Sequence, residues 1–189
     1  MSSEPPGDAE SLLSAFARWA AGTRVRDEAA GRARQRWLHQ QASEAATLAG
    51  TLLDLAEGRA AVTILSAQRR YSGHLVGVGA DLCVLEEPGR VTVVGLSRVI
   101  AVQPQPTPAT ARPAAASGNR AIEMVMTFQG ALSAMAMDLA PVRIALVGTE
   151  ILIGDLMGAG EDVVTLRVPG TPPRPAYLPV AAIEAFSPR

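Results

Sequence analysis

Apolar and polar positions alternate with a period of two between residues 62 and 102, and again between residues 142 and 186. Successive side chains of a β-strand point to opposite faces, so this period predicts two sets of short strands. In the first set we expect strands at 62–67, 69–78, 82–85, 91–96 and 98–102. In the second set we expect strands at 142–146, 150–158, 163–168, 176–178 and 182–186.

A period of three to four residues precedes both sets and predicts helices there. The longest such pattern covers residues 25–57, and a second covers residues 121–140. Gly31 and Gly50 each weaken a helix by about 1 kcal/mol relative to alanine, so the first pattern is compatible with a break at either residue. Its stripe of leucine and alanine fits a helix packed on its own domain or a coiled-coil pair. A short amphipathic helix is also predicted after Asp8, a good N-cap.

A motif of spaced glycines occurs once in each strand set. Residues 73–85 read GHLVGVGADLCVL and residues 154–166 read GDLMGAGEDVVTL, so both follow the frame G-x-L-x-G-x-G-x-D-x-x-x-L. The same positions recurring at an offset of 81 residues indicate an internal repeat. Glycine weakens a strand unless the strand bends or another backbone comes close, so the motif predicts small, strongly curved barrels.

The two strand sets are separated by a stretch of different composition. Residues 103–119 hold four prolines and few large apolar side chains, which predicts an extended, flexible linker. We therefore expect four parts: a lead with a short helix (1–24), a helix with a first barrel (25–103), the linker (104–119), and a helix with a second barrel (120–189).

The order of these features resembles the Sm-like family. A helix, five short strands, a curved second strand with glycines, an aspartate at the start of the third strand and a tight break before the fifth are found there too. The resemblance covers residues 45–103 and 125–187. It implies an α+β, mainly β fold of two Sm-like five-stranded barrels, each preceded by a helix, plus an N-terminal helical extension. Other small five-stranded barrels, of the SH3 type, share much of this pattern, and a fold of that type is the alternative.

Strand alternation also predicts the core and the exposed edges. We expect eight side chains to point into two separate barrels: Leu75, Leu85, Val99, Val102, Leu156, Leu166, Ile183 and Phe186. The fourth and fifth strands of an incompletely closed barrel leave backbone groups facing outward. We therefore expect at least one such edge to pair with another barrel, within the chain or between two chains.

The resemblance implies ring assembly and RNA binding, and the residues for RNA contact are where this sequence departs from the family. In that family a stacking side chain and an asparagine follow the motif aspartate. Here Leu-Cys-Val-Leu follows Asp81 and Val-Val-Thr-Leu follows Asp162. The arginine–glycine pair of the family is reduced to Arg98 in the first copy and is missing from the second. The side chains that would stack on RNA bases and hydrogen-bond to their edges are therefore absent from these positions.

Six residues are candidates for binding: Arg69, Arg70, Tyr71, Asp81, Arg98 and Asp162. The first three form a basic-aromatic cluster on a strand, although edge charges that prevent aggregation explain it equally well. Arg98 fits a phosphate contact or a solvated arginine. The two aspartates fit a catalytic carboxylate pair, or each caps the turn between the second and third strands through its own backbone.

Catalytic and cofactor chemistry lacks its usual groups in this sequence. His39, His74 and Cys83 are too few for a metal site, and no third glycine completes G-x-G-x-x-G after Gly79. Cys83 lies between apolar residues of a predicted strand, where we expect it to pack and not to react. We therefore predict that the chain is not an enzyme and takes no cofactor.

Composition narrows the choice of partners. The 189 residues carry a net charge of −1, and the basic residues, all of them arginine, form no block, so an electrostatic footprint for nucleic acid is lacking. A single cysteine suits a reducing cytoplasm, and no apolar stretch reaches the ~18 residues of a membrane span. We predict a cytoplasmic, non-catalytic binding or scaffold protein that acts through protein contacts or self-association into a homo-oligomer. An RNA-binding Sm-like protein is the alternative.

Overall fold

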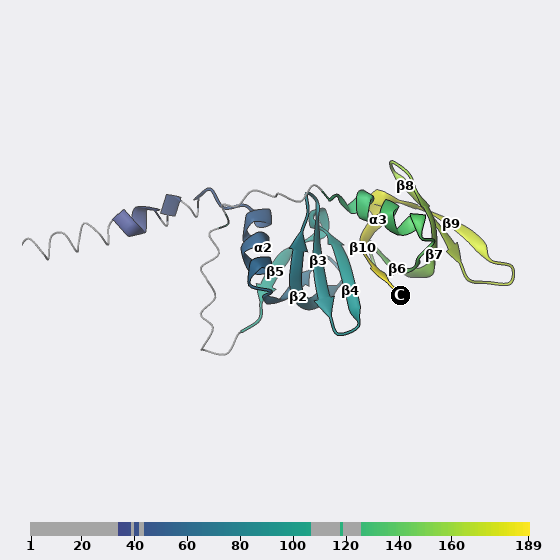
Figure 1. The fold of residues 1–189 in the computed structure, drawn as a ribbon, viewed down its shortest axis with the longest axis horizontal. Helices are drawn as coiled ribbons and strands as arrows, with labels where there is room; N and C mark the ends of the chain where they lie inside the picture. Colours follow the sequence, from purple (N-terminus) through teal and green to yellow (C-terminus); the bar gives the residue numbers. More distant parts are fainter. Residues whose placement is uncertain (1–33, 39, 42–43, 107–117, 119–125) are drawn as a thin grey trace, which may run out of the picture. The chain divides into compact units, whose positions relative to one another are not determined.

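The structure is a computed structural model. It describes residues 34–38, 40–41, 44–106, 118 and 126–189 (Figure 1). The chain divides into two compact units, Met1–Ala45 and Ala46–Arg189. In the first unit the described residues 34–38, 40–41 and 44 are helical, and Gln40 Nε2 donates a hydrogen bond to Glu44 Oε1 at 3.2 Å. The short helix predicted after Asp8 lies outside the described residues. All the strands belong to the second unit.

Two short helices accompany the strands. Helix α2 (Leu48–Glu57) begins after Thr47, and helix α3 (Phe128–Met137) begins after Thr127. Each threonine hydroxyl accepts a hydrogen bond at 3.0 Å from the N–H three residues later, which is the usual N-cap arrangement. The predicted end of the helix pattern at residue 57 is confirmed, but one continuous helix over 25–57 is wrong, because Thr47 takes an extended backbone and starts a new helix. Gly50 lies inside that helix and does not break it.

Ten strands form one antiparallel sheet, in the order β5-β1-β2-β3-β4-β10-β6-β7-β8-β9. The first half consists of β1 (Ala61–Leu65), β2 (Arg70–Val78), β3 (Leu82–Glu87), β4 (Arg90–Gly95) and β5 (Ala101–Pro104). The second half consists of β6 (Pro141–Leu146), β7 (Ile151–Ala159), β8 (Val163–Val168), β9 (Arg174–Pro179) and β10 (Ile183–Pro188). Single 3₁₀ turns, η1 (Leu96–Arg98) and η2 (Val180–Ala182), precede β5 and β10. Each predicted strand is therefore present, with its ends shifted by up to a few residues.

The fold class expected from the sequence is wrong. Instead of two separate Sm-like barrels produced by an internal duplication, the chain forms a single open sheet. The two halves meet where β4 pairs with β10, with Val94 opposite Ala185 and Val93 opposite Phe186. We name this junction the seam. The outward backbone groups of β4 find their partners in β10, so neither half closes on itself. The two strand sets do pair within the chain, but as parts of one sheet and not as the expected contact between two barrels.

The glycine motif marks an irregularity at the same place in both halves. The strand register shifts within two pairs of residues, Leu75/Gly77 between β2 and β3 and Leu156/Gly158 between β7 and β8. Gly154 shows why a side chain is excluded: a Cβ there would lie 2.3 Å from the carbonyl oxygen of Arg167. Such a close approach of another backbone is one reason for glycine in a strand.

The buried side chains form two clusters that both cross the seam. Of the eight predicted core residues, Val99 and Val102 are partly buried and the other six are at most 2% exposed. The cluster under α3 includes Leu82 and Val93 from the first half, and the cluster under α2 includes Ala145 and Ala185 from the second half. The expectation of two separate cores is therefore wrong.

A helix covers each half of the sheet. Helix α2 packs on β2, and helix α3 packs on β7 and contacts β4 across the seam (Figure 1). The rings of Phe128 on α3 and Phe186 on β10 meet edge to face with their centroids 5.1 Å apart. Helix α3 thus stabilises the seam as well as its own half.

Prolines occupy both outer edges of the sheet. Residues of an antiparallel strand point their N–H and C=O alternately toward the partner strand and away from it. The Val180 N–H donates to the Asp162 carbonyl oxygen at 2.7 Å, so the backbone groups of Val180 point toward β8. Every second residue back along β9 from Val180 therefore also faces β8, and the residues between them face away. Pro175, Tyr177 and Pro179 consequently point their backbone groups away from β8, and of these three only Tyr177 has an N–H.

The opposite edge follows the same rule. The Gln105 N–H donates to the Ala61 carbonyl oxygen at 2.8 Å, so Val102 and Pro104 of β5 face away from β1. Of these two, only Val102 has an N–H. Proline on edge strands prevents pairing with further strands, so both edges of the described sheet resist extension.

The predicted linker, residues 104–119, is described only at 104–106 and 118. Gly118 is buried against α2: its N–H donates to Asp54 Oδ2 at 2.8 Å, and its carbonyl oxygen accepts from the Thr47 N–H at 3.0 Å. This anchoring of the segment to α2 was not expected from its composition.

Candidate functional site

Arg69, just before β2, reaches across the seam to the second half of the sheet. Its guanidinium group donates hydrogen bonds to the carbonyl oxygens of Leu146 at 3.0 Å, Gly148 at 2.8 Å and Glu150 at 3.0 Å. These oxygens belong to the turn between β6 and β7. Arg69 therefore holds the two halves together, and most of its donors are already used.

A buried carboxylate lies beside this contact. Glu184 on β10 is 1% exposed, and its Oε1 accepts hydrogen bonds from the hydroxyls of Tyr71 at 2.6 Å and Ser66 at 2.7 Å. Burial raises the pKa of Tyr71 well above its usual value of 10.0, and the hydrogen bond to Glu184 acts in the same direction. Tyr71 therefore stays protonated and keeps donating to Glu184. Glu184 was not predicted as a site residue. The only indication in the sequence is that it is a single acidic residue within an apolar predicted strand.

The surface over this junction is hollowed and basic. A hollow of about 230 Å³ extends over the ends of β2, β4, β6 and β10, and an adjoining hollow of about 300 Å³ shares Arg90, Arg143 and Ser187 with it. We name the two together the seam hollow. Its described lining residues include five arginines and no carboxylate side chain: Arg69, Arg70, Arg90, Arg143 and Arg189.

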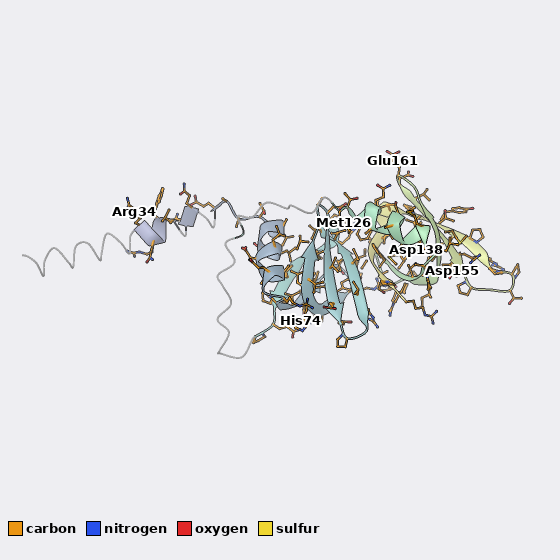
Figure 2. All side chains as sticks on the ribbon, viewed as in Figure 1. Arg34, His74, Met126, Asp138, Asp155 and Glu161 are labelled. Atoms are coloured by element: carbon orange, nitrogen blue, oxygen red, sulfur yellow. The ribbon has the colours of Figure 1, made fainter. Side chains whose placement is uncertain are left out.

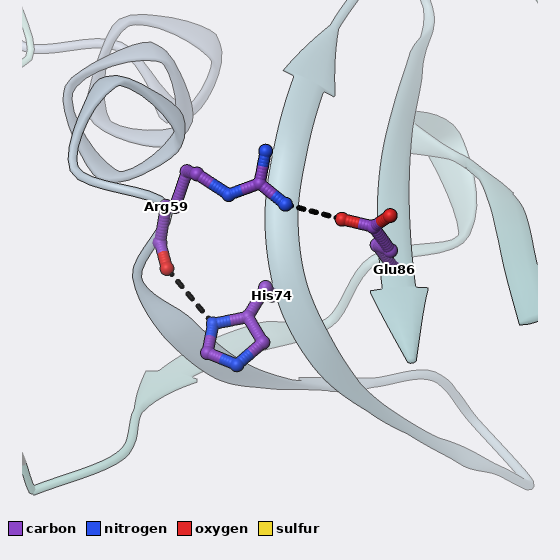
Figure 3. Close-up of polar contacts among 3 residues, drawn as sticks. All are labelled: Arg59, His74 and Glu86. Atoms are coloured by element: carbon purple, nitrogen blue, oxygen red, sulfur yellow. Dashed lines mark hydrogen bonds and ion pairs between the residues drawn. The ribbon is translucent and has the colours of Figure 1, made fainter. Parts of the chain in front are cut away.

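Acidic side chains lie next to the seam hollow but are paired. Glu86 and Glu87 line a neighbouring hollow of about 300 Å³. Glu86 forms an ion pair with Arg59, whose carbonyl oxygen lies 2.9 Å from His74 Nδ1 (Figure 3). In the second half, Asp155 on β7, labelled in Figure 2, pairs with Arg167 at 2.9 Å. Glu87 lies 3.7 Å from Arg90, so an acidic side chain borders the seam hollow on this side.

The six candidate residues from the sequence fall into two groups. Arg69, Arg70 and Tyr71 all line the seam hollow. The other three serve the fold. The Arg98 guanidinium donates to the Ala181 carbonyl oxygen and so joins η1 to η2. Asp81 Oδ1 accepts from the Phe128 N–H at 2.6 Å and fixes the start of α3, and the Asp162 carbonyl oxygen holds the start of η2.

Arg90, Arg143 and Arg189 were missed by sequence reasoning. They lie on β4, on β6 and just after β10, and only the order β4-β10-β6 brings them to one place. The sequence carries no signal for this convergence beyond the expectation that edges of the two strand sets pair.

Nucleophilic and metal chemistry have no support among the described residues. Cys83 is 0% exposed, and burial raises the pKa of its thiol from 9.0 to about 12. Within the described ranges, no group of three or more histidine, cysteine, aspartate or glutamate side chains is placed to hold a metal ion. The helices in the same ranges all lack the length and apolarity to span a bilayer.

Comparisons of the chain with protein-family models, with curated proteins and with solved structures found no match.

Proposed function

We propose that the chain is a non-catalytic binding or scaffold protein that acts through contact with another protein. The observation that supports this most strongly is the seam hollow, in which five arginines gather without a carboxylate among the described lining residues. Charged groups at protein interfaces are arranged so that potentials are complementary. A site with unbalanced positive charge is therefore suited to a negatively charged partner.

The edges of the sheet support contacts through its faces. Open sheet edges are the usual route by which β-proteins pair with other chains. Here Pro104, Pro175 and Pro179 remove outward N–H groups from both edge strands. Self-association remains part of the proposal only through the faces of the sheet.

RNA binding is the second candidate. The same five arginines favour it, because guanidinium groups also bind phosphates. Two features favour a protein partner instead. Of the two aromatic rings that line the hollow, Phe186 is 1% exposed and Tyr71 is fixed to Glu184, so neither offers a free face of the kind on which bases stack. The net charge of −1 also gives no long-range attraction for RNA.

Affinity isolation from the native cell, with and without ribonuclease, separates the two candidates. We expect co-purifying proteins that survive ribonuclease and are lost when Arg90 and Arg143 are both replaced by glutamine. Arg167→Gln is the matched control, since Arg167 is an exposed strand arginine outside the hollow. Recovery that depends on RNA would favour the second candidate. Partners retained equally by all variants would contradict a role for the seam hollow.

A further inference from the structure

The arginines of the seam hollow differ in how far they are already engaged. Arg69 is held by three backbone oxygens. Arg90 Nη1 lies 3.7 Å from Glu87 Oε2, with both side chains substantially exposed, and such surface pairs contribute little. Among the residues that the structure describes, Arg70, Arg143 and Arg189 have no ion pair. Up to four guanidinium groups are therefore available to a ligand.

The available arginines approach the hollow from different strands. Strand β10 lies between β4 and β6, and Arg143 is directly opposite Ser187 of β10. Arg90 lies two residues beyond the position of β4 that is level with Ser187, and strands lie ≈ 4.8 Å apart, so the backbones at Arg90 and Arg143 are separated by roughly 12 Å. Side chains on one face of an extended peptide are spaced by about 7 Å. Long arginine side chains can thus contact two acidic groups of one extended chain.

The lining of the hollow is not only basic. Ile151 contributes apolar surface beside the arginines, and Ile153 of the adjoining hollow is 38% exposed. An inorganic anion would leave this apolar surface in contact with water. A ligand that places an apolar group next to its charges covers both kinds of surface.

The shape of the seam hollow suits a chain segment. The first hollow, about 230 Å³, has room for one or two side chains, and the second hollow, about 300 Å³, continues it. Two joined hollows match alternate side chains of an extended peptide, which lie on one face.

From these observations we infer that the seam hollow binds an extended acidic peptide segment supplied by the partner protein, in which an aliphatic residue has a carboxylate two positions away on either side, so that all three side chains lie on one face. This inference rests on the proposed function, since it names the chemistry of that partner. The carboxylates pair with Arg70, Arg90 and Arg143, and the aliphatic side chain covers Ile151 and Ile153. Paired guanidinium–carboxylate contacts supply the specificity for acid over amide.

Fluorescence anisotropy with the full-length protein tests the inference. The probe is a labelled peptide of about twelve residues containing two Glu-Ser-Leu-Ser-Glu units, in which the Glu and Leu side chains lie on one face, and its matched controls carry Gln for Glu or Gly for Leu. We expect binding of the acidic probe that weakens at least about tenfold with Arg143→Gln and with either control peptide. Arg167→Gln should bind as tightly as the parent. Circular dichroism confirms that each variant is folded.

Two further arms separate the sources of negative charge. Inorganic phosphate and a single-stranded RNA of about ten nucleotides are titrated as competitors. Weak competition by phosphate and by RNA agrees with the inference, whereas tighter binding of RNA than of the acidic peptide overturns it. An acidic peptide that fails to bind also overturns it. If ribonuclease-resistant partners are still isolated in that case, the proposed function stands and only the peptide chemistry is wrong.

Discussion

The hydroxyl of Tyr71 on β2 donates a 2.6 Å hydrogen bond to the carboxylate of Glu184 on β10. The two residues belong to different halves of the sheet, so this bond crosses the seam. Glu184 is 1% exposed and depends on Tyr71 and Ser66 for its described side-chain hydrogen bonds. A buried carboxylate that loses a donor is costly, which makes this contact a sensitive point of the fold.

Replacing Tyr71 by phenylalanine should therefore destabilise the protein by about 1–3 kcal/mol, because it leaves the buried carboxylate short of a donor. Urea denaturation measures the change in the free energy of unfolding. Tyr177→Phe is the control, because Tyr177 is 68% exposed, and its effect should stay within about 0.5 kcal/mol. Equal effects of the two substitutions would show that the Tyr71–Glu184 bond contributes nothing.

Neighbouring positions on β7 test which face of the sheet is buried. Leu156 is 0% exposed, so Leu156→Asp buries an unpaired carboxylate and should cost more than ~4 kcal/mol. Met157 is 39% exposed, and Met157→Asp should cost much less. Thermal melting compares the two variants. Similar melting temperatures would mean that the assignment of faces is wrong.

The stability of the protein should fall at alkaline pH. The pKa of the Cys83 thiol is raised by burial from 9.0 to about 12, so the folded protein retains a proton that the unfolded chain releases. The thiol's contribution is fully present below about pH 9 and is lost as the pH rises toward 12, at about 1.4 kcal/mol per pH unit. The free energy of unfolding, measured by urea denaturation at several pH values in this range, should fall less steeply with pH for Cys83→Ala than for the parent. Identical slopes would contradict the buried thiol.

Much of this fold could be predicted from the sequence. The alternation of apolar residues located all ten strands, because burial of one sheet face fixes which residues must be apolar. The core residues Leu75 and Leu166 followed from the same rule. Strand alternation carries no information about whether outward groups of β4 pair with β10 or close a barrel, so the single open sheet was not predicted.

The candidate site could be predicted only in part. Arg69, Arg70 and Tyr71 are adjacent in sequence and were recognised as a cluster. Arg143 joins them through the pairing of strands far apart in sequence, which no local pattern encodes. The bond from Asp81 to the Phe128 N–H was missed for the same reason, since it joins a turn of the first half to a helix of the second half.

Removing the prolines of β9 should expose the sheet edge. Pro175→Thr combined with Pro179→Thr adds two outward N–H groups beside that of Tyr177, and threonine favours strands. We expect association that increases with protein concentration, measured by static light scattering. Pro88→Thr, in the turn between β3 and β4, is the control and should leave the molecular mass unchanged. An unaltered mass for the β9 variant would show that the prolines do not protect this edge.

Binding of an acidic protein segment at the seam hollow is tested most directly by nuclear magnetic resonance. The Nε–Hε signals of the arginines are followed while the Glu-Ser-Leu-Ser-Glu peptide is added to the full-length protein. Progressive shifts of Arg70, Arg90 and Arg143, with Arg167 unchanged, are the predicted result. Uniform small shifts of all arginines, or none at the seam hollow while RNA shifts them, would contradict the account.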